Sequence, residues 1–138
     1  MFFACLFIRM QTTDMATLLL IDDDDLVRFS LNELLTDAGH QVVEMSSGLG
    51  CESYLETQLI DCVITDIVMP DKDGIEVLLS VKQTFPHIPV IALSGGGRIS
   101  GREYLVMADA LGADAVVDKP VMPDVLLETV SRVLEKLD

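Results

Sequence analysis

Short runs of aliphatic residues alternate with longer segments of helical periodicity from Thr17 to the carboxyl terminus. Such runs are typical of parallel strands buried on both faces, and the segments between them then cross over as helices. The runs are Leu18–Ile21, Val42–Met45, Cys62–Thr65, Val90–Leu93 and Ala115–Val117. The pattern predicts one α/β domain, a (βα)5 parallel sheet over residues 16–138.

The segments between the runs carry apolar residues at helical spacing. The first has an apolar stripe of Leu26, Phe29, Leu31, Leu34 and Leu35 and ends at Gly39; the second is centred on Tyr54 and Leu55; the third runs from Ile75 to Phe85, before Pro86; the fourth spans Leu105–Leu111 and closes at Gly112; the fifth spans Val125–Leu137. Five helices are therefore expected, the last of them after the fifth strand.

Residues 1–15 precede the first strand and are expected to be an extension that is disordered or reflects a mis-assigned start, because Met10 and Met15 offer later starts. The apolar stretch Phe2–Ile8 is far shorter than the roughly 20 residues of a membrane-spanning helix. Its only nearby cation, Arg9, follows the stretch, whereas a secretory signal places basic residues before it. We expect neither a signal peptide nor membrane insertion.

Charge and cysteine content narrow the function classes. Lys and Arg number 9 against 23 Asp and Glu, and the net charge of −14 disfavours binding to nucleic acid or anionic lipid. The three cysteines lack CxxC or Cys/His spacing, which argues against a disulfide framework and a zinc site. A protein of the reducing cytoplasm is expected, with an acidic surface suited to partners that have a basic face.

Polar residues follow four of the five predicted strands. They are Asp22 to Asp25 after the first, Asp66 after the third, Ser94 to Gly97 after the fourth, and Lys119 and Pro120 after the fifth. Because ligands of open α/β sheets gather at the carboxyl ends of the strands, these residues are expected to converge. Facing carboxylates repel unless a cation neutralises them, and their hard oxygens select Mg²⁺ or Mn²⁺. A carboxylate beside such an ion, with a Lys and a hydroxyl in reach, predicts phosphoryl transfer to Asp66.

These residues resemble a known family. The relevant stretches are Leu18-Leu19-Leu20-Ile21-Asp22-Asp23, Asp66-Ile67-Val68-Met69-Pro70-Asp71-Lys72-Asp73-Gly74, Ser94 after Val90-Ile91-Ala92-Leu93, and Lys119-Pro120. With this combination the chain is similar to the receiver domain of response regulators in two-component signalling, from about Thr17 onwards. The resemblance implies a flavodoxin-like sheet of strand order 2-1-3-4-5. It also implies a stand-alone phosphoacceptor rather than an enzyme, without an output domain.

The resemblance also implies roles for single residues. Asp66 would be the phosphoacceptor, and Mg²⁺ would be held by Asp22, Asp23, Asp66 and the backbone carbonyl of Val68, with Asp23 a direct ligand. Ser94, Gly95 and Lys119 would bind the phosphoryl group, and Pro120 would follow a cis peptide bond. The phosphodonor would be a phosphohistidine on a sensor histidine kinase or a histidine phosphotransfer protein.

The chain departs from the family pattern at its expected switch. Ser94 and Val116 occupy the switch positions, but Val116 stands where many receivers have Tyr or Phe, and Val121 stands where Phe often follows Lys-Pro. The glycines from Gly95 to Gly97 make that loop an alternative moving part. The route by which a signal leaves the domain therefore stays open.

Two other functions fit parts of the sequence. A Mg²⁺-dependent phosphohydrolase of the haloacid dehalogenase kind would use Asp23 and Asp25 but would leave the motif after Asp66 unexplained. A phosphorylation-independent adaptor with a vestigial site is the other alternative. Asp24 and Asp25 are expected to cap a helix, His40 and His87 to be exposed, Cys62 to be buried, and Met122 to pack a helix.

Overall fold

The computed structural model describes residues 15–67, 69, 74–94, 106 and 110–135. The calls on Val68, on the Gly95–Gly97 loop and on residues 1–14 lie outside these residues, as does most of the predicted helix at Leu105–Leu111. The division into an extension and a domain therefore stays a prediction. Among the described residues, no helix is long and apolar enough to cross a membrane.

Five parallel strands form one sheet. They are β1 (Thr17–Ile21), β2 (Gln41–Met45), β3 (Cys62–Asp66), β4 (Val90–Ser94) and β5 (Ala115–Asp118). Their order is β2-β1-β3-β4-β5, and every neighbouring pair is parallel. This confirms the α/β fold and the flavodoxin-like strand order. Each predicted strand is present, extended by one residue at an end in all five cases.

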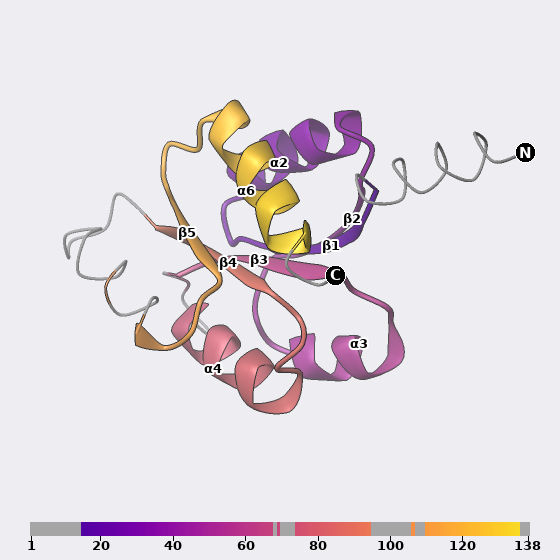
Figure 1. The fold of residues 1–138 in the computed structure, drawn as a ribbon, viewed down its shortest axis with the longest axis vertical. Helices are drawn as coiled ribbons and strands as arrows, with labels where there is room; N and C mark the ends of the chain where they lie inside the picture. Colours follow the sequence, from indigo (N-terminus) through magenta and orange to yellow (C-terminus); the bar gives the residue numbers. More distant parts are fainter. Residues whose placement is uncertain (1–14, 68, 70–73, 95–105, 107–109, 136–138) are drawn as a thin grey trace, which may run out of the picture.

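Helices cover both faces of the sheet (Figure 1). Helices α2 (Asp25–Asp37) and α6 (Pro123–Glu135) lie on one face, and α3 (Cys51–Thr57) and α4 (Gly74–Thr84) lie on the other. The end of α2 follows local rules, because Gly39 adopts a φ of 101°, which a residue with a side chain rarely adopts.

The two faces bury two separate cores, and neighbouring residues of β1 point into different ones. Leu18 and Leu20 pack under α2 and α6, whereas Leu19 and Ile21 pack under α3 and α4. All four are fully buried. At about 1.5–3 kcal/mol for each such side chain, this burial keeps β1 inside the sheet, between β2 and β3, and places the residues after Ile21 at the carboxyl edge of the sheet.

The predicted apolar stripe of α2 is wrong in its first turns. Leu31 and Leu35 are buried, but Leu26 is 80% exposed and Phe29 is 60% exposed. The prediction that Met122 packs a helix is also wrong, because Met122 lies just before α6 and is 61% exposed. Apolar residues at helical spacing thus form two faces here, one on the core and one on the surface.

The prediction that His40 is exposed is also wrong, because His40 is buried. Its Nδ1 accepts a hydrogen bond of 3.1 Å from the backbone N–H of Ala16, 24 residues earlier. His87 is exposed and Cys62 is fully buried, which confirms both predictions. Burial raises the pKa of the Cys62 thiol far above its ordinary value, with a smaller contribution from the nearby Asp114 charge.

Candidate functional site

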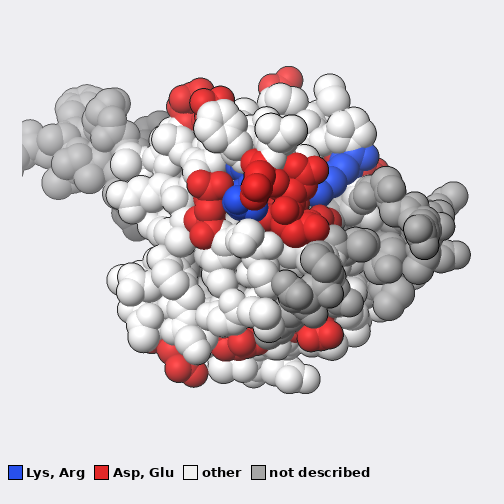
Figure 2. All heavy atoms as spheres, turned by 180° about the vertical axis from the view of Figure 1, so that it is seen from behind, with Lys and Arg blue, Asp and Glu red and all other residues white. Residues whose placement is uncertain are grey.

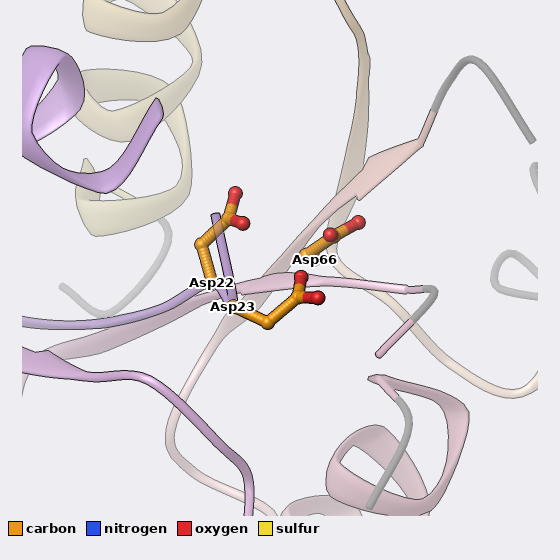
Figure 3. A group of neighbouring side chains, drawn as sticks. All are labelled: Asp22, Asp23 and Asp66. Atoms are coloured by element: carbon orange, nitrogen blue, oxygen red, sulfur yellow. The ribbon is translucent and has the colours of Figure 1, made fainter. Parts of the chain in front are cut away.

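Three carboxylates meet at the carboxyl edge of the sheet. Asp22 and Asp23 follow β1, and Asp66 is the last residue of the adjacent strand β3. One oxygen from each lies within 4.8 Å of the others (Figure 3). Asp22 is fully buried, Asp66 is nearly so, and Asp23 is exposed. The cluster is therefore accessible from solvent on the Asp23 side.

Lys119 brings a cation to this cluster from the residue directly after β5, a strand that lies three places from β1 in the sheet. Its Nζ donates to Oδ2 of Asp22 at 2.9 Å and lies 3.2 Å from Oδ2 of Asp66. Burial by itself would lower the pKa of Lys119, but the hydrogen bond to Asp22 and the charges of Asp66 and Asp22 outweigh it and raise that pKa. The peptide bond from Lys119 to Pro120 is cis, as expected.

Ser94 ends β4 beside the phosphoacceptor candidate. It is buried, and the register pairs its neighbour Leu93 with Asp66. The carbonyl of Ser94 accepts a hydrogen bond of 2.7 Å from the N–H of Lys119. Val116 is half-buried and packs against the core under α3 and α4. The structure thus places Ser94 at the site and Val116 in the neighbouring core.

Asp24 and Asp25 do what the sequence predicts. The Asp24 carboxylate caps α2 by accepting from the N–H groups of Leu26 and Val27, at 3.0 and 3.2 Å. Asp25 lies in the first turn and pairs with Arg28 at 2.6 Å. These two carboxylates therefore serve the helix start, apart from the cluster of three.

The close packing of Gly74 on the backbone of β3 explains why the motif after this strand ends in glycine. A Cβ at this position would collide with the carbonyl oxygen of Asp66 and would lie 2.5 Å from Cα of Ile67. The N–H of Gly74 donates to the carbonyl of Ile67 at 2.7 Å. The start of α4 thus packs directly on the backbone of Asp66.

Arg28 and Glu44 border the site but cannot be predicted from the sequence as part of it. Arg28 donates to the carbonyl oxygen of Asp22 at 2.6 Å, and its Nε donates to Glu44 on β2 at 3.1 Å. The spacing of Asp25 and Arg28 signals only a helical ion pair. The contact between α2 and Glu44 depends on the packing of the helix over β2.

The donor set fits a hard divalent cation. Three carboxylates face one ammonium group, so two negative charges remain uncompensated among the described residues of the cluster. Acidic side chains crowd one face of the molecule beside Lys and Arg side chains (Figure 2). Carboxylate oxygens are the ligands of Mg²⁺, which also retains several waters, and the exposed side of the cluster leaves room for them.

An apolar groove lies next to Lys119. A cavity of about 280 Å³ is lined by Leu26, Val27, Ser30, Leu31, Lys119, Pro120 and Val121. It runs between the start of α2 and the segment between β5 and α6. The exposed Leu26 thus borders both the groove and open solvent.

Comparisons with known proteins agree on this architecture. The model of the family described as response regulator receiver domain matches residues 18–131. The transcriptional regulatory protein AfsQ1 of Streptomyces coelicolor is 35% identical over 122 residues, which cover 88% of this chain and 52% of that protein. Response regulator Rre1 of Synechocystis is 32% identical, over 87% of this chain and 52% of that protein. The chain therefore spans about half the length of these relatives.

Solved structures show the same fold over most of this chain. A putative response regulator from Chloroflexus aurantiacus superposes with a TM-score of 0.80 at 30% identity, covering 87% of this chain and 98% of the other. A CheY-like receiver domain protein from Methanospirillum hungatei gives 0.79 at 27% identity, covering 89% and 96%. Both neighbours are chains of nearly the size of the matched region.

Proposed function

We propose that this chain, which belongs to the response regulator receiver domain family, accepts a phosphoryl group on the carboxylate of Asp66. A receiver domain is a phosphoacceptor signalling module rather than a classical enzyme. The observation that carries the proposal is the cluster of Asp22, Asp23 and Asp66 with Lys119 at one edge of the sheet. This is the only cluster of three candidate metal-binding side chains among the described residues.

In the proposed reaction, an oxygen of Asp66 attacks the phosphorus atom of a phosphohistidine. The O–P bond forms as the P–N bond breaks, and the imidazole leaves with the electron pair of that bond and takes up a proton. Lys119 holds Asp66 in place before the reaction through its 3.2 Å contact. Because the Lys119 side chain is only 18% exposed, its charge is partly shielded from water and acts on the incoming phosphoryl oxygens.

Mg²⁺ would be held by Asp22, Asp23, Asp66 and the carbonyl of Val68, and Mn²⁺ could replace it. When bound, it offsets the negative charge that would otherwise keep the phosphodonor and the carboxylates apart. Ser94 and Gly95 would hydrogen-bond the phosphoryl oxygens, and Ser94 with Val116 would report the modified state to the surface. The burial of Ser94 at the end of β4 supports its part of this assignment.

The phosphodonor is proposed to be a protein, either a sensor histidine kinase or a histidine phosphotransfer protein. It would bind over the apolar groove, because any protein that brings a phosphohistidine to Asp66 must cover the surface next to Lys119. Leu26, which lines the groove at the start of α2, is 80% exposed and so offers apolar surface there. Exposed apolar side chains around a groove are typical of a docking site.

Phosphotransfer from a panel of autophosphorylated histidine kinases tests this surface. Leu26→Ser should slow transfer from the kinase that phosphorylates the wild type but leave phosphorylation by acetyl phosphate unchanged. Leu59→Ser is the matched control, because Leu59 is 93% exposed in the loop between α3 and β3. Equal transfer rates for Leu26→Ser and wild type would rule out this docking surface.

The structure favours phosphoacceptor chemistry over the two alternatives. A haloacid dehalogenase mechanism needs Asp25 to work beside Asp23, but the Asp25 carboxylate pairs with Arg28 and is 84% exposed. A vestigial adaptor would have no need for Lys119 to bridge two carboxylates. We further propose that this receiver domain works in the cytoplasm, signals by contact with another protein and does not bind nucleic acid.

The decisive experiment measures the intact mass of the purified protein after incubation with Mg²⁺ and acetyl phosphate. The wild type should gain one phosphoryl group, and Asp66→Asn or chelation of the metal should abolish the gain. Asp37→Asn serves as the control, because Asp37 is exposed at the far end of α2 and should be phosphorylated normally. A gain that persists in Asp66→Asn would place the phosphoryl group elsewhere and refute the proposal.

A further inference from the structure

Arg28 joins three segments around the acidic cluster. Its guanidinium donates to the backbone carbonyl of Asp22 at 2.6 Å, to Oδ1 of Asp25 at 2.6 Å and to Oε1 of Glu44 at 3.1 Å. These partners belong to the loop after β1, the first turn of α2 and strand β2. The side chain is only 15% exposed, so it is packed in this position rather than free on the surface.

The carbonyl that Arg28 binds belongs to the peptide bond between Asp22 and Asp23. The N–H of Asp22 is held as well, by the carbonyl of Met45 at 3.1 Å. A carboxylate oxygen of Asp22 also accepts from the N–H of Asp24 at 2.9 Å. Because a peptide unit is planar, a hydrogen bond that fixes its carbonyl also fixes the position of the next Cα atom, that of Asp23.

The other end of the contact is also fixed. Glu44 accepts a second hydrogen bond, 2.7 Å long, from Asn32 on α2, and Asn32 in turn accepts one from Thr36. The hydrogen bond to Asp25 is the largest of the causes that raise the pKa of Arg28, so the guanidinium stays charged. Asp25 and Glu44 offset this charge, so the effect of Arg28 on the cluster is mainly geometric.

We propose that Arg28 is a positioning residue for the metal site, which holds the Asp22–Asp23 peptide so that both carboxylates face Asp66. The inference rests on the proposed function, because it assigns Arg28 to the same Mg²⁺ site. Arg28 acts through the backbone and does not touch the phosphoryl group. Residues that orient metal ligands in this way commonly contribute 10- to 100-fold to metal affinity.

Arg28→Lys separates geometry from charge. Lysine keeps the positive charge, but one ammonium nitrogen cannot reach the three acceptors that the planar guanidinium fork binds. We expect the Mg²⁺ dissociation constant, measured by calorimetric titration without any phosphodonor, to rise about tenfold. Arg132→Lys is the matched control, because Arg132 is exposed in the last turn of α6, and its dissociation constant should equal that of wild type.

A second variant keeps the test valid if Arg28→Lys also lowers stability. Glu44→Gln removes the charge of one partner but keeps an oxygen acceptor, so Arg28 can still hold the carbonyl of Asp22. Its Mg²⁺ affinity should stay within about threefold of wild type, well short of the loss expected for Arg28→Lys. A merely structural role would lower the free energy of unfolding of Arg28→Lys without changing the Mg²⁺ affinity of its folded form.

The outcomes distinguish this inference from the proposed function. Equal Mg²⁺ affinity in wild type and Arg28→Lys would overturn the positioning role, whether or not Asp66 is phosphorylated. Tighter binding in Arg28→Lys would overturn it too. If the wild type binds Mg²⁺ and Arg28→Lys binds it more weakly, the positioning role stands. This holds even if acetyl phosphate adds no mass to the wild type, because that result would count against the proposed function alone.

Discussion

Lys119→Met should lower the free energy of unfolding of the metal-free protein and make its stability strongly dependent on Mg²⁺. Methionine has a similar length to lysine but cannot donate to Asp22 at 2.9 Å or offset the charge of Asp66 at 3.2 Å. Asp22 is fully buried, so water could not replace the ammonium partner that its carboxylate would lose. The three carboxylates of the cluster would then repel one another without a counter-charge.

The size of the effect follows from burial. Removing one partner of a buried ion pair typically costs 3–5 kcal/mol, because the remaining charge stays buried. The Lys119 side chain is 18% exposed, so we expect a loss at the lower end, about 3 kcal/mol. Mg²⁺ should bind the variant more tightly than the wild type, and a tenfold gain in affinity returns about 1.4 kcal/mol at saturating metal.

Urea unfolding in chelator and in saturating Mg²⁺ measures both quantities. Lys82→Met is the matched control, because Lys82 is 20% exposed and pairs with Asp114 at the opposite edge of the sheet. That variant should lose stability by an amount that Mg²⁺ does not change. The reasoning would be refuted if Mg²⁺ narrowed the gap to wild type equally for both variants, or if Lys119→Met lost less than about 1 kcal/mol in chelator.

Three further perturbations test other parts of the structure. Gly74→Ala should cost about 1–3 kcal/mol and slow phosphorylation, because its Cβ would collide with the backbone of Asp66; normal phosphorylation by acetyl phosphate would contradict this. The folded-state pKa of Cys62 is raised, so its stabilising contribution is full below its unfolded pKa near 9.0 and is lost as pH rises above it. Between pH 7 and pH 10, the stability gap between wild type and Cys62→Ala should therefore narrow by about 1.4 kcal/mol, and a constant gap in urea unfolding would argue against a protonated thiol. His40→Leu should cost about 1–3 kcal/mol, because the buried N–H of Ala16 loses its acceptor, and an unchanged urea midpoint would show that this bond contributes nothing.

Most of the secondary structure can be predicted from the sequence because its causes are local. A run of aliphatic residues becomes a buried strand wherever helices cover it, and Asp24 caps α2 through N–H groups only two and three residues away. The aspartates at the ends of β1 and β3 are predictable for a topological reason, because parallel strands bring their carboxyl ends to one edge of the sheet. Sequence thus determines which residues can reach the site.

The sequence is less informative about surfaces. Leu26 and Phe29 stand at helical spacing, as the buried Leu31 and Leu35 do, yet they remain exposed. Helical periodicity shows that apolar residues are spaced for a helix, but it does not show which of them contact the sheet. That contact depends on how the helix is rotated about its axis against its neighbours. His40 shows the converse, since this polar loop residue is buried and accepts a hydrogen bond from the backbone N–H of Ala16, 24 residues earlier.

The chain itself determined the five strands, the helix ends and the set of acidic, hydroxyl and basic residues at the strand ends. Only the tertiary structure decided which of these groups touch. Lys119 lies 97 residues from Asp22 and bonds to it because β5 joins the sheet beside β4. Arg28 reaches Glu44 because α2 packs over β2. Local propensity extends over a few residues, whereas contacts between distant charges exist only once the cores under both faces of the sheet have fixed the order and register of the strands.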